Sequence, residues 1–328
     1  MIYHADYFNQ ESFFQKLEEA FEKAGKRYMC VLNAITYNEG VISREDLANF
    51  TFSPLTNIKG HMRYSTLIQK LQNVNVLLPL YEDYYQLNPH LLSSSDERIT
   101  RYRAVKFSSE LVINQFMIWC RNIGLNSFNK GERNSNVSGF QFAYTAPTYV
   151  NGFVRYNKGK PIPGFIVADV LIGKKVEALH IDFFIQKIKI IQASNKFIRL
   201  FPILIVDSTE VKALQELKSN GVVVATVKEL FGEEYSELLK SLINTITNAG
   251  VILKKNPESY LNLMGQLTKL VEGKTNNLRG DLFELAVGYY HGKYCQFLEI
   301  GKRIIVSGMG SREIDVLAIY EEEVKVVE

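Results

Sequence analysis

Cysteine is scarce in this sequence, and the three cysteines (Cys30, Cys120 and Cys295) lie far apart, with no Cys-x-x-Cys or Cys/His ligand spacing. A disulfide framework or a structural zinc site is therefore not expected. The chain also lacks an apolar run of about 18 residues, which excludes a predicted membrane span. Its first residues have neither the basic start nor the apolar stretch of a signal peptide. Together these absences predict a cytoplasmic protein.

An excess of one charge is also missing, because 38 basic residues stand against 35 acidic ones and the formal net charge is +3. A mildly basic chain permits nucleic-acid binding without requiring it. We find no Walker A loop, no Gly-x-Gly-x-x-Gly and no Ser/His/Asp order, so no nucleotide cofactor is expected. The hydrophobic fraction of 46% is sufficient for real cores, and 328 residues suit two or three domains.

Three segments differ in pattern and predict an α/β protein, α+β overall. Short helical patterns and an extended aromatic run occupy residues 1–94. Helices alternate with β-branched strands over residues 95–250, and a helical stretch followed by strands occupies 251–328. Polar, turn-rich stretches near residues 92–95 and 254–257 suit linkers between these predicted domains.

The first segment predicts helices at 26–37 and 64–71, with a short helix between them. Gly40 suits the left-handed end of the first helix, and Ser43 is a good N-cap for the short one. Apolar positions in 74–80 and 84–87 predict a two-stranded hairpin.

This order resembles a winged helix-turn-helix domain. The resemblance implies that the third helix enters the major groove of double-stranded DNA. By this resemblance, the candidate DNA-contacting residues are Arg63, Tyr64, Ser65, Thr66, Gln69 and Lys70. The helix carries few basic residues, however, and the expected wing tip, Glu82-Asp83, is acidic. A winged helix used for protein interaction is therefore the alternative.

The middle segment predicts a sheet buried on both faces. Strands are expected at 139–144, 163–172, 200–206 and 222–225, and helices at 105–121, 180–193, 210–218 and 233–247. This order is similar to the second half of the restriction-endonuclease-like fold, also written PD-(D/E)xK.

The catalytic positions of that family do not match this middle segment. Its second expected strand, 163–172, offers Asp169 but no lysine two residues later, and a single carboxylate holds a divalent ion poorly. The segment is then either a degenerate nuclease domain kept for binding or dimerisation, or an unrelated α/β domain with a structural Asp169. Aromatic and basic residues alternate over 149–160, which suits either a nucleic-acid backbone or a solvated hairpin.

The C-terminal segment carries the clearest chemical pattern. A helix at 278–288 contains Glu284, strands are expected at 295–300 and 303–306, and the runs 312–320 and 324–328 predict a β-hairpin. A tight turn at Glu321-Glu322 would pair Asp315 with Glu328, at a Cβ separation of about 5 Å. A loop one residue longer would shift the partner of Asp315 by one position. Two carboxylates this close repel unless a cation lies between them, which indicates a divalent metal site. An ordinary surface hairpin edge is the alternative.

This segment resembles the PD-(D/E)xK nucleases, especially the branch with type IV restriction enzymes and archaeal Holliday-junction resolvases. The matching motifs are Arg279-Gly280-Asp281-Leu282-Phe283-Glu284, then Glu313-Ile314-Asp315, then Glu328. The resemblance implies Mg²⁺ (or Mn²⁺) held by Asp315 and Glu328, with Glu284 as a third catalytic residue. The family's lysine would fall at position 330, beyond the last residue. We therefore expect a truncated nuclease domain that is inactive in this chain.

These patterns lead to three hypotheses. In the first, the intact parent is a Mg²⁺-dependent endonuclease that acts on double-stranded DNA and can form a homodimer. Family analogy suggests a role in restriction or phage defence. In the second, the chain is a non-catalytic DNA-binding or regulatory protein. In the third, it is a protein-interaction scaffold, which absence of DNA binding even at low salt would support.

Overall fold

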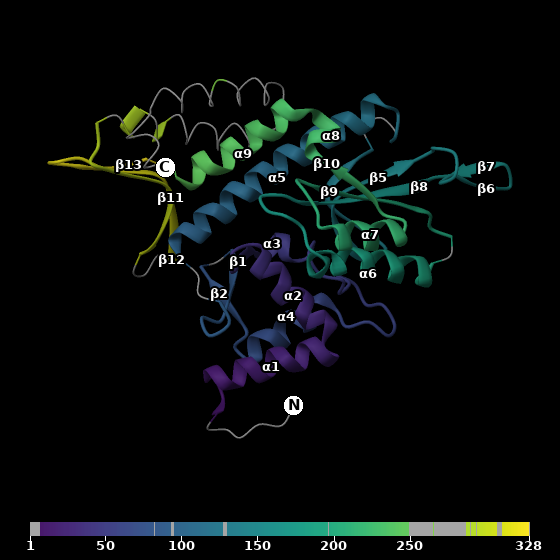
Figure 1. Ribbon diagram of the computed structural model, residues 1–328, viewed down its shortest axis with the longest axis horizontal. Helices are drawn as coiled ribbons and strands as arrows, with labels where there is room; N and C mark the ends of the chain where they lie inside the picture. The colour runs from purple at the N-terminus through teal and green to yellow at the C-terminus, as the bar shows by residue number, and fades with distance from the viewer. Residues whose placement is uncertain are drawn as a thin grey trace. The chain divides into compact units, whose positions relative to one another are not determined.

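The structure, a computed structural model, describes residues 7–81, 83–92, 95–126, 130–195, 197–248, 265, 287–288, 290–292, 294–306 and 310–327. It confirms the predicted mixture of helices and strands, arranged in several sheets (Figure 1). The chain forms two compact units, Met1–Tyr102 with Ser109–Gly232 and Arg103–Ser108 with Glu233–Glu328. The division into three domains at residues 94 and 250 stays a prediction.

The first unit begins with helices and a small sheet. Its elements are α1 (Glu11–Ala24), α2 (Lys26–Tyr37), β1 (Val41–Ser43), α3 (Arg44–Leu47), α4 (Tyr64–Asn73), β2 (Leu77–Leu80) and β3 (Tyr84–Leu87). The strands form an antiparallel sheet in the order β1-β3-β2. The two predicted helices and the hairpin are confirmed. The sequence does not predict β1, because a strand of three buried residues shows no alternation.

Local signals place these elements as the sequence predicts. Gly40, just beyond α2, has φ +86°, a conformation open to glycine at little steric cost. The Ser43 hydroxyl accepts a hydrogen bond from the Asp46 backbone N–H at 3.1 Å, so it caps α3. The core beneath the sheet is formed by apolar side chains of α1, α2, α3 and α4: Phe14, Leu17, Val31, Leu32, Ile35, Leu47, Leu67, Ile68 and Leu71.

A five-stranded mixed sheet forms the rest of the first unit. After α5 (Asp96–Asn122) come β4 (Glu132–Val137), β5 (Phe140–Thr148), β8 (Gly164–Leu171), β9 (Leu200–Val206) and β10 (Val223–Thr226). The strand order is β10-β9-β8-β5-β4. Strands β8, β9 and β10 are parallel, whereas β5 is antiparallel to both of its neighbours. Helices α6 (Ala178–Ser194) and α7 (Val211–Ser219) connect the parallel strands, and α8 (Val227–Phe231) follows β10.

The buried strands follow from their composition. Strands β8 and β9 are almost continuously apolar and almost continuously buried, as expected of parallel strands covered on both faces. One expectation is corrected here. Helix α5 starts at Asp96 rather than at residue 105, because Ser95 caps a charged first stretch that shows no apolar stripe. The sequence does not predict β4, the polar edge neighbour of β5.

A buried lysine joins three parts of the first unit. Lys187 lies in the middle of α6, and its side chain is fully buried. Its ammonium group donates hydrogen bonds to Asp169 Oδ2 at 3.0 Å, to the Gln141 carbonyl at 2.6 Å and to the Asn49 carbonyl. An ammonium group has three donors, so this geometry satisfies all of them.

The surroundings of this ion pair are apolar. The rings of Phe142 and Phe183 lie 4.5 and 5.0 Å from the Lys187 ammonium. The other Asp169 oxygen accepts the Ala143 backbone N–H at 2.7 Å. Burial raises the pKa of Asp169 and lowers the pKa of Lys187, and each partner's charge opposes the effect of burial on the other.

The second unit contains α9 (Glu233–Thr247) and an antiparallel sheet of β11 (Phe297–Val306), β12 (Gly310–Ile319) and β13 (Val324–Val327) in that order. The predicted helix at 233–247 is confirmed. The two strands expected at 295–300 and 303–306 are instead one strand, β11. Gly301 has φ +66° inside it, and the Arg103 side chain donates to its carbonyl. Among the described residues, none of the helices combines the length and apolar composition that crossing a membrane requires.

We predict that Asp169→Asn lowers the free energy of unfolding by about 3–5 kcal/mol, because it leaves the buried Lys187 ammonium without a countercharge. Urea denaturation followed by circular dichroism measures this change. The control is Glu22→Gln on the exposed face of α1, which should change stability by less than about 0.5 kcal/mol. Equal stability of Asp169→Asn and the wild type would contradict a charged pair.

Candidate functional site

The predicted metal ligand Asp315 lies in β12, one residue before the first described pair between β12 and β13. The hairpin pairs Val316 with Val327, and the register continues to the turn, where the Tyr320 N–H donates to the Glu323 carbonyl at 2.8 Å. This is the register that the sequence predicts for a two-residue turn. The described register ends at the pair Val316 and Val327, which is adjacent to Asp315. The other two predicted catalytic residues, Glu284 and Glu328, lie outside the described residues.

Asp315 is surrounded by apolar neighbours on its strand. It is half-buried and shares a face of β12 with Leu317 and Ile319, while Val316 and Ala318 are buried on the opposite face. A carboxylate oxygen is a ligand that Mg²⁺ prefers, but such an ion needs several of them. The described residues contain no group of three or more His, Cys, Asp or Glu that could hold a metal. Asp315 is therefore the one described residue of the predicted ligand set, and the metal site stays a prediction.

The predicted DNA contacts gather on the outward side of α4. All of them are exposed except Tyr64, which is half-buried: Arg63, Ser65, Thr66, Gln69 and Lys70. Positions four residues apart lie one above the other on a helix. The pairs Ser65/Gln69 and Thr66/Lys70 therefore make a continuous polar face, opposite the face of α4 that enters the core.

Two of these residues also hold α4 in place. The Arg63 Nε donates to the Leu55 carbonyl at 2.9 Å. The Tyr64 hydroxyl donates to the Arg44 carbonyl at 3.4 Å, and burial raises the pKa of this hydroxyl. Tyr64 thus joins α4 to α3, and its hydroxyl is directed toward the protein.

The middle sheet has no free carboxylate at the position that corresponds to the nuclease motif. Both oxygens of Asp169 are used, one by Lys187 and one by the backbone of Ala143. Sequence reasoning identifies Asp169 but misses its lysine, which comes from α6 and not from the same strand. The available signal is a charged residue within the apolar stripe of α6, between Phe184 and Ile188.

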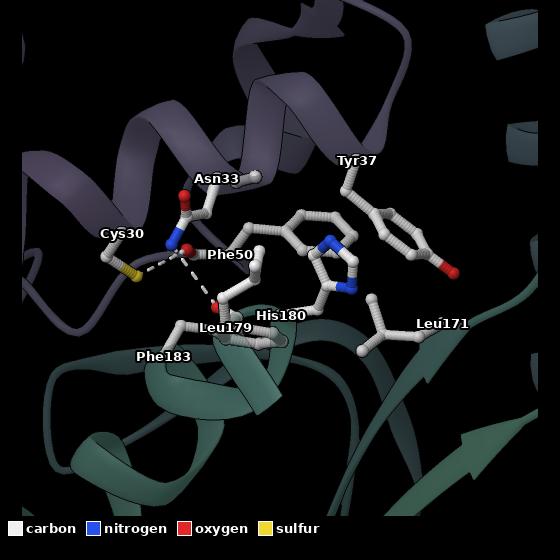
Figure 2. Close-up of a pocket in the computed structure, with 9 residues that line it drawn as sticks. Cys30, Asn33, Tyr37, Phe50, Leu171, Leu179, His180 and Phe183 are labelled. Atoms are coloured by element: carbon white, nitrogen blue, oxygen red, sulfur yellow. Dashed lines mark hydrogen bonds between the residues drawn. The ribbon is translucent and has the colours of Figure 1, made fainter. Parts of the chain in front are cut away.

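A small pocket lies between α2 and α6 (Figure 2). Cys30, Asn33 and Tyr37 line it from α2, and His180 and Phe183 from α6. The Cys30 thiol donates a hydrogen bond to the Phe50 carbonyl at 3.3 Å, and burial raises the pKa of this thiol to about 12. A thiol with this pKa is protonated near neutral pH and is a poor nucleophile. The pocket therefore lacks an activated cysteine.

The His180 ring in this pocket is held in its neutral form. Its Nδ1 accepts the Glu177 backbone N–H at 3.0 Å, and its ring packs edge-on against Tyr37 with centroids 4.8 Å apart. Burial is the largest cause that lowers the pKa of His180 to about 4, and the nearby Lys174 lowers it further. This ring acts as a cap for α6.

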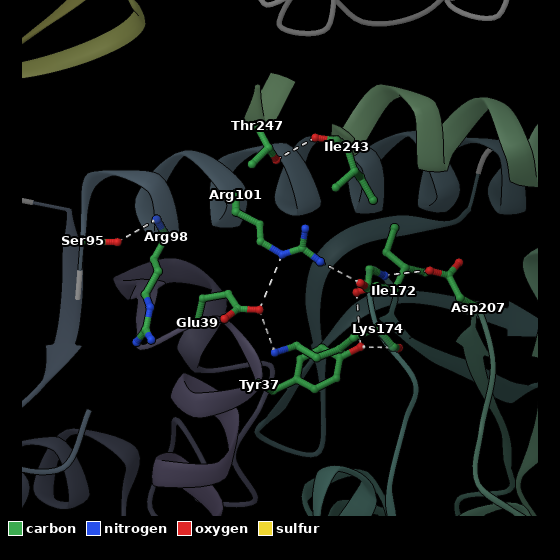
Figure 3. A network of polar contacts seen from close by, with 11 residues as sticks. Tyr37, Glu39, Ser95, Arg98, Arg101, Ile172, Lys174, Asp207, Ile243 and Thr247 are labelled. Atoms are coloured by element: carbon green, nitrogen blue, oxygen red, sulfur yellow. Dashed lines mark hydrogen bonds and ion pairs between the residues drawn. The ribbon is translucent and has the colours of Figure 1, made fainter. Parts of the chain in front are cut away.

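A polar network stands at the carboxyl end of β8 (Figure 3), the edge where open α/β sheets often bind ligands. Glu39 Oε1 lies 3.1 Å from Lys174 Nζ and 3.5 Å from Arg101 Nε. Arg101 also donates to the Gly173 carbonyl at 3.1 Å, and the Gly173 N–H donates to Asp207 at 2.7 Å. These groups satisfy one another, so the network joins α2, α5 and the loop after β8 without offering a free charged group.

Comparisons with known proteins identify no family. No family model matches the sequence, and no curated protein matches it. Among solved structures, protein VC1899 from Vibrio cholerae shows a TM-score of 0.23 and 9% sequence identity, over 74% of this chain and 57% of that protein. The chain thus spans a little over half the length of VC1899, and a similarity at this level carries no argument about fold or function.

We predict that His180 makes stability depend on pH. Its pKa is lower in the folded state than the ordinary value of 6.5, so the unfolded chain binds the proton more readily. The contribution to stability is therefore lost as the pH falls from about 6.5 toward about 4. Urea unfolding at about pH 7 and about pH 5 should show a smaller loss for His180→Gln than for the wild type. Identical losses would show that this ring is not held neutral.

Proposed function

We propose that this chain binds double-stranded DNA with the exposed face of α4. The observation that carries the proposal is the continuous polar face of this helix, with Arg63 at its start and Lys70 in its last turn. The order α2, β1, α3, α4, β2, β3 and the sheet order β1-β3-β2 support a winged helix-turn-helix arrangement. In such domains the third helix enters the major groove.

The side chains on this face suit the groove chemically. An amide such as that of Gln69 can bond both N6 and N7 of adenine, and the hydroxyls of Ser65 and Thr66 can contact bases or phosphates. Lys70 and Arg63 supply the cations that phosphate contact requires. A helix of 10 residues is about 15 Å long. It therefore suits a groove that admits one α-helix.

We predict that Lys70→Gln weakens binding to all duplex sequences and reduces the slope of log K against log salt by about 0.9, the value for one lost phosphate contact. Fluorescence anisotropy of a labelled duplex of about 20 base pairs, from about 50 to 200 mM salt, measures this slope. Lys212→Gln, an exposed lysine on α7, is the matched control. If the wild type does not bind duplex DNA at the lowest salt, the alternative of a protein-interaction domain replaces the proposal.

The C-terminal hairpin favours a second candidate function, a PD-(D/E)xK nuclease. We propose that Asp315 is a ligand for Mg²⁺ or Mn²⁺, together with Glu284 and Glu328, which lie outside the described residues. The support is the register of β12 and β13, because its next pair would join Asp315 to position 328. A divalent ion held there would polarise a phosphodiester and lower the pKa of an attacking water. The alternative remains a non-catalytic, DNA-binding regulatory protein.

We predict that the chain binds Mn²⁺ and that Asp315→Asn weakens this binding by at least about tenfold, because a hard cation loses a charged oxygen ligand. Isothermal titration calorimetry measures both affinities. Glu322→Gln, an exposed acid in the turn of the same hairpin, is the matched control and should bind Mn²⁺ as the wild type does. Unchanged Mn²⁺ affinity in Asp315→Asn would remove the metal-site proposal and favour the regulatory alternative.

A further inference from the structure

A separate two-stranded hairpin extends from the central sheet of the first unit. Its strands are β6 (Arg155–Asn157) and β7 (Lys160–Ile162), and neither joins the five-stranded sheet. Figure 1 shows the hairpin beyond the ends of β5 and β8. The register pairs Arg155 with Ile162 and Asn157 with Lys160, which leaves a two-residue turn. A ribbon of this kind is well placed to meet a large partner.

The turn places a lysine at the tip of this ribbon. Lys158 and Gly159 have φ +48° and +78°, the two positive values of a type I′ turn, whose twist matches the flanking strands. Glycine adopts this conformation readily, whereas a residue with a side chain does so at a steric cost, and asparagine or aspartate is the usual choice. Lys158 therefore keeps a cation at the tip despite its backbone conformation.

The charge of this region has one sign. Residues 133–168, which include the whole hairpin, contain no aspartate and no glutamate. The Lys158 and Lys160 side chains are exposed, as is that of Arg199 beside the hairpin. Arg199 Nη1 donates to the Gly152 carbonyl at 2.7 Å, which holds the segment that leads into the hairpin. The ribbon thus presents cations that suit a polyanion.

Large aromatic rings are exposed among these cations. The exposed fractions of Tyr156 and Phe197 are both 71%, and that of Tyr149 is 52%. The Arg155 guanidinium lies 4.7 Å from the centre of the Phe197 ring and donates to the Phe197 carbonyl at 2.9 Å. This contact anchors one face of the hairpin. Because side chains alternate along a strand, Tyr156 lies on the opposite face, together with its cross-strand partner Pro161.

We propose that this hairpin binds unpaired nucleic-acid strands, with the Tyr156 ring stacked on a base and Lys158 and Lys160 on the phosphates. Stacking needs a base whose face is free, which a single strand or an opened duplex provides. A cationic, acid-free ribbon with an exposed ring matches both parts of such a strand. An anionic membrane would match the cations, but beside Pro161 the described hairpin exposes a single large aliphatic side chain, Ile162, to insert. The inference rests on the proposed nucleic-acid binding function but uses a different surface from α4.

The test is fluorescence anisotropy of the full chain with labelled oligothymidylate and oligouridylate of about 20 nucleotides and with a duplex of similar length. Tyr156→Ala should weaken binding to the single strands by about 5- to 150-fold, the range for one lost base stack. It should change duplex binding by less than about twofold. Tyr156→Phe, which keeps the ring, should bind as the wild type does. The two single strands show whether DNA or RNA is preferred.

The controls separate the hairpin from general effects. Tyr7→Ala removes another exposed tyrosine, 58% exposed and distant in sequence, and should leave single-strand binding unchanged. Lys158→Gln should reduce the salt slope for single strands by about 0.7, and Lys212→Gln should not. Because these side chains are exposed, circular dichroism should show unchanged folding.

Three results would overturn this proposal: no single-strand binding by the wild type at about 50 mM salt, unchanged single-strand binding in Tyr156→Ala, or equal loss for single strands and duplex. Binding to anionic phospholipid vesicles in place of single strands would overturn it in favour of a membrane surface. The proposed function fails separately, because Lys70→Gln on α4 tests duplex binding and leaves the hairpin intact.

Discussion

The buried ammonium group of Lys187 is the constraint on which the first unit depends. A buried cation is tolerated only when its donors are satisfied and a countercharge is near. Here the acceptors come from Asn49 in the N-terminal part, Gln141 in β5 and Asp169 in β8. The helix α6 can therefore pack only when all three segments are in place. The apolar core around it also takes in Cys30, Tyr37 and Phe52 of the N-terminal part, so polar and apolar contacts require the same arrangement.

This constraint also bears on where chemistry can occur. Asp169 is the acid that the resemblance to nucleases would select in the middle sheet, yet both of its oxygens have protein partners. A metal ion would have to displace a buried ammonium and leave its charge unpaired. Asp169 thus has a structural role in the middle sheet. The exposed polar side chains that the proposed binding functions use lie elsewhere, on α4 and on the β6–β7 hairpin.

The sequence predicts the elements whose pattern is periodic or continuously apolar, such as α2, β9 and α9, to within a residue or two. It limits the β12–β13 register to two alternatives that differ in turn length, and the structure has the one with the two-residue turn. It fails to predict β1, which is short, and β4, which is polar. It also predicts a break between two strands at Gly301, where β11 in fact continues. The partners of Lys187 depend on contacts across up to 138 positions, and no local pattern encodes these.

The small net charge of +3 is compatible with nucleic-acid binding, because charge acts locally. The Debye length is about 10 Å at 0.1 M salt, so a phosphate responds to the cations near it and hardly to the total. The acids are distributed unevenly: Glu321, Glu322 and Glu323 are adjacent, whereas residues 133–168 have none. The hairpin at the end of the central sheet therefore carries a local excess of positive charge that the overall composition conceals. A surface of this kind is found only by asking which residues share one exposed segment, and not by counting charges over the chain.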